Sequence, residues 1–341
     1  MVVSQYRWAV FVPIAVDQDR YAQRILGGTR GSETNPGRAA TQRCQTGAGV
    51  RVSGTVAAPS RYTLRVTSKT IVITGASDGV GAAAARRLSR NGEKVVVVGR
   101  SQSKTTAVAG ELGADYFVAD FSDLSQVRAL AEKIRSEYPR IDVLANNAGG
   151  MAREIQMTAD GLEKTYQVNY LAPFLLTTQL MDVLVDSRAT VLNTTSSSQR
   201  LLPRVRITDL ENTDRRRPSI AYALTKLAIV LFTMELHRRY HASGVSAATF
   251  HPGYVNSNFG EASGSRILHF MQHRVPITAR FTATVDQGAE QLIWLASSRP
   301  GIDWRSGEYY SKHKIAKANR LAYDPVLASE LWDHTLAKFA T

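Results

Sequence analysis

From Lys69 onward, short apolar runs alternate with longer segments whose apolar residues recur at helical spacing. The short runs are rich in β-branched residues, which is typical of strands buried on both faces. We expect strands over 69–74, 94–100, 114–120, 141–149, 189–196 and 245–253, and helices over 82–90, 101–112, 122–138, 160–186 and 219–241. This alternation predicts an α/β fold, a single domain built on a doubly wound parallel sheet of the Rossmann type.

Residues 1–66 lack this periodicity and are rich in Gly, Ser, Thr, Pro and Arg, which predicts a flexible or disordered extension before a domain over 67–341. Their apolar run Trp8–Val16 is too short to span a bilayer. The extension is therefore expected to be a non-functional addition or a targeting segment. We expect no transmembrane segment, and peripheral membrane contact stays open.

Composition limits the classes of function. With 44% hydrophobic and 21% charged residues, the chain has the composition of an ordinary globular protein. The single cysteine, Cys44, excludes an internal disulfide framework, and we predict a reducing, cytoplasmic location. The net charge of +13 is spread along the chain without interleaved aromatic residues, so we expect no nucleic-acid partner.

Residues 74–81, TGASDGVG, join the first expected strand to the first expected helix. At such a junction the backbone N–H groups and the helix N-terminus can hold a phosphate. Glycine permits positive φ angles and lets a pyrophosphate approach the backbone closely. This position in a βαβ series predicts a dinucleotide ligand.

Further motifs follow in a fixed order: NNAG at 146–149, Asn169 in QVNYL, Ser196 in VLNTTS, YALTK at 222–226 and HPGYVNS at 251–257. With the TGxxxGxG spacing, they resemble the short-chain dehydrogenase/reductase family over about residues 68–341. The 25 residues between Ser196 and Tyr222, together with the C-terminal segment, resemble its retinol-dehydrogenase-like branch, whose members carry membrane anchors that are not evident here.

The resemblance implies hydride transfer between a nicotinamide cofactor and a carbonyl or alcohol, with Asn169, Ser196, Tyr222 and Lys226 as catalytic residues. The cofactor-binding residues that it implies are Gly75, Ser77, Asp78, Gly79, Val80, Gly81, Arg100, Asp120, Asn147, Ala148, Gly149, Tyr222, Lys226, Pro252, Gly253, Val255 and Ser257. The residues themselves agree with the catalytic assignment. Tyr222 and Lys226 share a helix face, and a nearby ammonium favours a phenolate and lowers its pKa.

The second expected strand ends in Gly99-Arg100-Ser101. An acidic residue there usually holds a ribose hydroxyl, whereas an arginine accommodates a 2′-phosphate. Arg100 therefore predicts NADP(H), with NAD less favoured. Asp120, which ends the third strand, is expected near the adenine.

Several alternatives remain. The apolar residues around 254–285 predict a lid over a lipophilic small-molecule substrate, or simply core. Tyr310 and Lys314 repeat the YxxxK spacing, but we expect them to be structural. The pairs His237/His241 and His269/His273 lack an evident third ligand, so we expect no metal. A catalytically silent NADP-binding scaffold or sensor is the alternative function, and the oligomeric state stays open.

Overall fold

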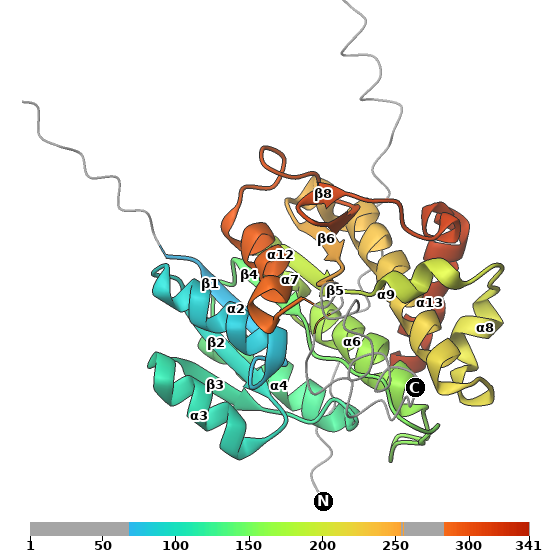
Figure 1. Cartoon of the computed structure of the whole chain (residues 1–341), viewed down its shortest axis with the longest axis horizontal. Coiled ribbons are helices and arrows are strands. Elements are labelled where there is room, and N and C mark those ends of the chain that lie inside the picture. Colours follow the sequence, from blue (N-terminus) through green and yellow to red (C-terminus); the bar gives the residue numbers. More distant parts are fainter. Residues whose placement is uncertain (1–67, 254, 256–282, 341) are drawn as a thin grey trace, which may run out of the picture. The chain divides into compact units, whose positions relative to one another are not determined.

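The computed structural model describes residues 68–253, residue 255 and residues 283–340 (Figure 1). The predicted extension over 1–66 and nearly all of the predicted lid over 254–285 lie outside the described residues. The strands are β1 (Thr70–Thr74), β2 (Lys94–Gly99), β3 (Asp115–Val118), β4 (Val143–Asn146), β5 (Thr190–Thr194), β6 (Ser246–Phe250), β7 (Glu308–Ser311) and β8 (Lys314–Ile315). The α-helices are α2 (Gly79–Arg90), α3 (Gln102–Leu112), α4 (Leu124–Glu137), α5 (Lys164–Tyr166), α6 (Ala172–Gln179), α7 (Met181–Asp186), α8 (Ile207–Glu211), α9 (Pro218–Tyr240), α12 (Val285–Ser297) and α13 (Pro325–Ala340).

The strands form one sheet in the order β3-β2-β1-β4-β5-β6-β7-β8. All neighbouring strands are parallel except β7 and β8, which pair antiparallel at the edge. The strand order reverses between β1 and β4, and ligands of doubly wound sheets bind at the carboxyl ends of the strands at such a point. The predicted doubly wound α/β fold is confirmed, and β8 adds a short antiparallel edge strand.

The uninterrupted apolar runs of the central strands follow from burial on both faces of the sheet. Ile71 and Ile73 of β1 face a cluster that includes α2, α3 and α12, whereas Val72 between them faces a cluster that includes α4, α6, α9 and α13. Alternate residues of a strand point to opposite faces, so a strand with helices on both sides needs apolar residues throughout. Figure 1 shows the two helical layers on either side of the sheet.

The single helix predicted over 160–186 is divided in the structure. It begins at Lys164, widens into a π-helical turn over Gln167–Leu171, and continues as α6 and α7. Proline has no N–H, so Pro173 cannot donate the hydrogen bond that an α-helix would direct to the Asn169 carbonyl. The proline thus accounts for the wider turn, and such turns are common at functional sites.

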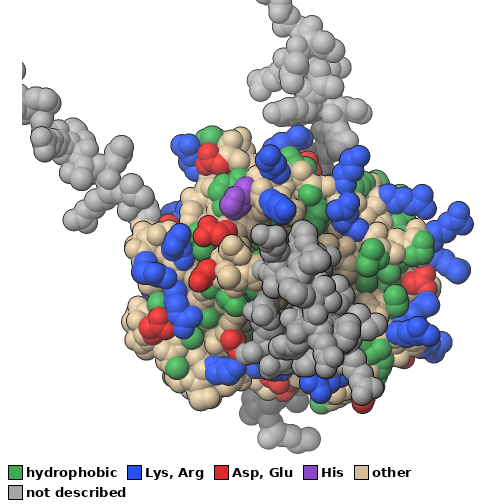
Figure 2. Space-filling model, viewed as in Figure 1, with side chains coloured by type: hydrophobic (Ala, Val, Ile, Leu, Met, Phe, Trp, Pro, Cys, Tyr) green, Lys and Arg blue, Asp and Glu red, His purple; other side chains and the backbone are tan. Residues whose placement is uncertain are grey.

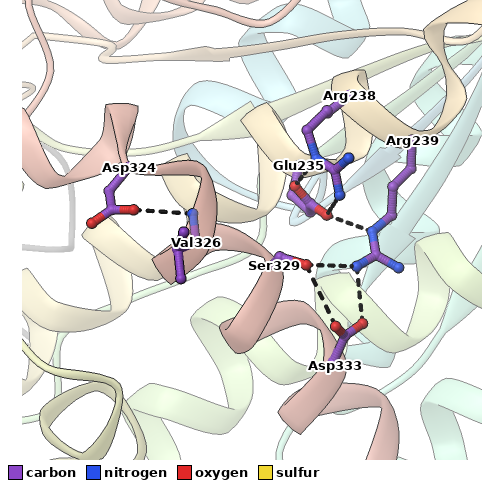
Figure 3. Close-up of polar contacts among 7 residues, drawn as sticks. All are labelled: Glu235, Arg238, Arg239, Asp324, Val326, Ser329 and Asp333. Carbon is purple, nitrogen blue, oxygen red and sulfur yellow. Dashed lines mark hydrogen bonds and ion pairs between the residues drawn. The ribbon is translucent and has the colours of Figure 1, made fainter.

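The C-terminal helix α13 packs against α9, the helix that carries YALTK. The ring of Trp332 on α13 lies 5.6 Å from that of Phe232 on α9, measured between centroids. It also lies 4.9 Å from the ring of Phe174 on the neighbouring helix α6. Figure 3 shows the polar part of this contact, in which Arg239 of α9 joins the buried Glu235 to Asp333 of α13. The end of the chain therefore helps to hold the helix on which the candidate catalytic residues lie.

Candidate active site

The glycine-rich loop connects β1 to α2 at the carboxyl edge of the sheet. Gly75 has a φ of +67°, which favours glycine, and a Cβ on it would lie 2.8 Å from the Cα of Ala148. A Cβ on Gly81 would lie 2.3 Å from the Gly75 carbonyl oxygen. The loop is packed so closely that neither position accepts a side chain, and this leaves the backbone and the start of α2 available to a phosphate.

Asn146 ends β4, and the residues after it, up to Gly149, connect three strands. The side chain of Asn147 donates to the Thr74 carbonyl of β1 at 3.1 Å and accepts from the Thr194 hydroxyl of β5 at 3.2 Å. The Thr74 hydroxyl oxygen in turn accepts from the backbone N–H groups of Asn147 and Ala148, each at 3.0 Å. These bonds fix the glycine loop against β4 and β5, so the cofactor edge and the catalytic edge form one rigid unit.

Ser196, Tyr222 and Lys226 meet beside this edge. Ser196 follows β5, while Tyr222 and Lys226 lie one turn apart on α9. The side chains of Ser196 and Tyr222 are hydrogen-bonded. Lys226 is 4% exposed, and its ammonium donates to the Thr194 carbonyl at 3.1 Å and lies 5.6 Å from the centroid of the Tyr222 ring. The structure thus brings Ser196 together with Tyr222 and Lys226, although 25 positions separate Ser196 from Tyr222 in the sequence.

Asn169 joins the same group from the π-helical turn. Its side-chain oxygen accepts from the Gly150 N–H at 2.8 Å, and its nitrogen donates to the Gly150 carbonyl at 2.8 Å. The same nitrogen contacts the Thr225 hydroxyl of α9 at 3.3 Å. A Cβ on Gly149 would lie 2.6 Å from the Asn169 side-chain oxygen and 3.2 Å from the Lys226 nitrogen. Gly149 is therefore the contact point between the NNAG segment and two of the four predicted catalytic side chains.

The electrostatics of the site differ from the sequence-based expectation. Burial raises the pKa of Tyr222 to about 12, and the hydrogen bond with Ser196 acts in the opposite direction without overcoming it. Burial also lowers the pKa of Lys226 to about 8, because a charged ammonium is poorly solvated there. The expected lowering of the Tyr222 pKa by Lys226 is not found, because burial of the phenol dominates and the Lys226 ammonium is directed to the Thr194 carbonyl.

The PG segment packs against α12. Gly253 has a φ of +91°, and Val255 pairs with Ala283. A Cβ on Gly288 would lie 2.5 Å from a methyl carbon of Val255 and 3.1 Å from one of Val80. Val80 of the glycine loop, Pro252 and Val255 therefore meet α12 at one place. Ser257 lies outside the described residues.

Two charged groups flank the end of β2. Arg100 is exposed, and no hydrogen bond or ion pair of its side chain occurs within the described part of the chain. Gly99, the residue before Arg100, lies beside the glycine loop, since a Cβ on Gly99 would lie 2.6 Å from the Ser77 hydroxyl. Asp78 caps α2, accepts from the Gly79 N–H at 2.8 Å, and pairs with Lys104 at 2.6 Å.

Lys104 is a residue that the sequence reasoning missed. It lies in the first turn of α3 and neutralises Asp78, the carboxylate nearest to where an anionic cofactor would meet the start of α2. Its position four residues after Arg100 is the feature of the sequence that could have indicated a second cation near the glycine loop. Asp120 accepts from the N–H and hydroxyl of Ser122, at 2.9 and 2.8 Å, and so fixes the turn before α4.

The other candidate sites have structural surroundings. The Tyr310 hydroxyl oxygen accepts from the Arg305 N–H at 2.7 Å, and Lys314 lies on the edge strand β8. The rings of His237 and His241 lie 4.5 Å apart, but no group of three or more potential metal ligands occurs among the described residues. The His269/His273 pair lies outside the described residues.

The fold and this arrangement agree with the comparisons to known proteins. The chain matches the short chain dehydrogenase family over residues 69–267 and belongs to that family. It is therefore an oxidoreductase that acts on CH–OH or C=O groups, in a family that binds NAD(P). The glycine loop, in which no Cβ fits at Gly75 or Gly81, suits a dinucleotide.

The relatives place the chain in the retinol-dehydrogenase-like branch. It is 37% identical over 278 residues to "Putative daunorubicin C-13 ketoreductase DnrU" of Streptomyces sp. (strain C5), covering 79% of this chain and 92% of that protein. It is 33% identical over 291 residues to retinol dehydrogenase 14 of Mus musculus, covering 78% and 84%. A gluconate 5-dehydrogenase from Burkholderia cenocepacia J2315, solved with NADP and tartrate, is 25% identical with a TM-score of 0.56, covering 71% and 92%.

These relatives correct the predicted location. A cytoplasmic protein was expected from the single cysteine. The relatives, however, include retinol dehydrogenases, and this branch is the one for which the resemblance implies membrane anchors. Residues Pro218–Ser243, which include α9, are also long and apolar enough to cross a membrane by length and composition, although 78% of the apolar window is buried in this fold. The cytoplasmic prediction is therefore wrong, while this mostly buried helix is by itself weak support for a membrane span.

Proposed function

We propose that this protein is an NADP(H)-dependent reductase or dehydrogenase of lipophilic carbonyls and alcohols, in which Tyr222 exchanges the proton with the substrate oxygen. The observation that carries the proposal is the hydrogen bond between Ser196 and Tyr222, with Lys226 on the next turn of α9. The serine and tyrosine hydroxyls can bind the same substrate oxygen. The bound nicotinamide would supply or accept the hydride at the adjacent carbon.

With its raised pKa, Tyr222 carries at neutral pH the proton that carbonyl reduction requires. A phenol with a pKa of about 12 keeps its proton at pH 7 and can donate it to the oxygen that forms. The ammonium of Lys226 has three N–H donors, of which one is directed to the Thr194 carbonyl. The remaining donors would hold the ribose hydroxyls of the cofactor. Asn169 would position Lys226 through Thr225 and Gly149.

Arg100 supports the choice of NADP(H). It is exposed, directly follows Gly99, which packs against Ser77, has no partner in the described part of the chain, and stands where an acidic residue would favour NAD. The names of the relatives support a lipophilic substrate, because they refer to retinol and daunorubicin. The alternative is a catalytically silent NADP-binding scaffold or sensor, which would not need the proton donor.

The test of catalysis is NADPH oxidation against a panel of lipophilic aldehydes and ketones. Tyr222→Phe should abolish turnover but keep NADPH binding, which quenching of protein fluorescence measures. Tyr310→Phe is the matched control, because it has the same YxxxK spacing and a structural hydrogen bond. It should remain active. Turnover by Tyr222→Phe at more than a few per cent of the wild-type rate would contradict the proposal, and cofactor binding without any turnover by the wild type would support the scaffold.

The test of cofactor choice is a titration of NADPH and NADH. Removing the proposed contact between Arg100 and the 2′-phosphate should cost about 1.5–3 kcal/mol of binding free energy. This corresponds to a loss of about 10- to 150-fold in NADPH affinity. Arg100→Asp should also repel the phosphate and leave NADH binding nearly unchanged. Arg188→Asp is the control, because Arg188 precedes β5 and lies at the opposite edge of the sheet. An unchanged NADPH/NADH ratio in Arg100→Asp would refute the role of Arg100.

A further inference from the structure

The segment between Ser196 and Tyr222 is strongly basic. Residues 197–217 contain six arginines and three acidic residues, a net charge of +3. Two of the acids are already paired, Asp209 with Arg216 and Glu211 with Lys338. The six arginines, all exposed, are Arg200, Arg204, Arg206, Arg215, Arg216 and Arg217. We name this segment, together with Ile220, the arginine insertion.

The arginine insertion is held in place rather than loosely attached. The side chain of Asn319 donates to the carbonyls of Gln199 and Leu202, at 2.9 and 2.8 Å, and the Asn319 N–H donates to the Gln199 side chain at 2.7 Å. Leu202 and Val205, which belong to the insertion, are themselves buried. Leu201, between these anchored positions, is therefore held outward and is 82% exposed.

The arginine insertion begins and ends at the candidate active site. Its first helical turn, Ser197–Leu201, directly follows Ser196, and Ile220, which is 42% exposed, precedes Tyr222 by two residues on α9. Figure 1 shows α8, the middle of the insertion, at the periphery of the molecule, and Figure 2 shows basic side chains gathered with apolar ones in that region. The two ends of this surface therefore adjoin the catalytic residues along the chain.

We propose that the arginine insertion docks the protein on an anionic lipid surface. Arginines near a bilayer attract anionic headgroups, and outward aliphatic side chains enter the boundary with the acyl chains. No aromatic residue occurs within 197–220, which disfavours single-stranded nucleic acid as the partner. An acidic protein is the other partner that these charges could attract, and the test below includes it as an outcome.

Docking by this surface would let a lipophilic substrate pass from the bilayer to Ser196 and Tyr222 without crossing water. That consequence rests on the proposed function, but the docking does not. Binding to vesicles needs neither cofactor nor substrate, so the two proposals can fail separately.

The test is co-sedimentation of the full chain with vesicles of phosphatidylcholine, with and without phosphatidylserine. The variant removes three exposed arginines, as Arg200→Gln, Arg204→Gln and Arg215→Gln. Each arginine near an anionic surface contributes about a fivefold increase in partitioning, so the triple variant should bind about 100-fold more weakly. Leu201→Ser should weaken binding further.

The charge-matched control is Lys133→Gln, Arg188→Gln and Lys312→Gln, three exposed cations outside the arginine insertion. It should lose much less binding than the insertion variant. Equal losses in the two triple variants, or wild-type binding that does not depend on phosphatidylserine, would overturn the proposal. So would equally tight binding of soluble polyphosphate, or of an acidic protein, in place of vesicles. Melting temperatures like that of the wild type would show that the variants are folded.

Discussion

Gly149→Ala offers the sharpest test of how the candidate active site is assembled. The new Cβ would lie 2.6 Å from the Asn169 side-chain oxygen, a distance that real Cβ contacts do not show, and 3.2 Å from the Lys226 nitrogen. Gly149 does not have a positive φ, so the alanine introduces no backbone strain of its own. The whole effect must come from the displacement of Asn169 and Lys226.

The size of the effect follows from the contacts of Asn169. This side chain is buried and makes two hydrogen bonds of 2.8 Å to Gly150. Leaving a buried polar group unsatisfied costs about 1–3 kcal/mol. A loss of about 2 kcal/mol lowers the melting temperature by about 4–8 °C in a domain of this size. A shift of about 1 Å in a catalytic group can reduce the rate by about 100-fold, so kcat/KM should fall by about that factor.

The neighbouring residue supplies the control. A Cβ on Gly150 would meet no atom within 4 Å, and Gly150 does not have a positive φ either. Gly150→Ala should therefore melt and turn over like the wild type. Thermal unfolding and kcat/KM for NADPH-dependent carbonyl reduction are measured for both variants. If the two alanines behave alike, the close contact of Gly149 with Asn169 and Lys226 does not organise the site, and the reasoning fails.

Three further predictions follow from other parts of the fold. Burial would raise the pKa of Glu235, but hydrogen bonds from Arg238 and Arg239 lower it overall. Glu235→Gln should therefore cost about 1–2 kcal/mol in unfolding free energy. The same change at the exposed Glu330 should cost nothing measurable. Carbonyl reduction should fall above about pH 8, as Lys226 with its lowered pKa loses its proton while Tyr222 keeps its own. A profile flat to pH 10 would contradict this, and Lys226→Arg should remove the decline. Deleting residues 1–66 should leave the melting temperature and kcat/KM of the domain nearly unchanged, because the first strand begins at Thr70; aggregation of the truncated chain would count against the predicted extension.

Much of the fold could be predicted from the sequence because its causes are local. The apolar run of β1 needs burial on both faces, and this requirement is already present in TIVIT. The glycine loop follows from backbone sterics, and the common face of Tyr222 and Lys226 follows from the period of the helix. The order of these motifs along the chain was enough to indicate the family.

The tertiary structure decided what depends on groups far apart in the sequence. The Pro173 signal was present in the chain, but the contact of Asn169 with Gly150 became visible only when the π-helical turn was placed beside β4. Lys104 reaches Asp78 only because β1 and β2 are neighbours in the sheet. The pKa of Tyr222 was predicted in the wrong direction because spacing reveals the nearby ammonium but not the burial around it. Burial is set by every element packed against a group, and only the assembled fold defines it.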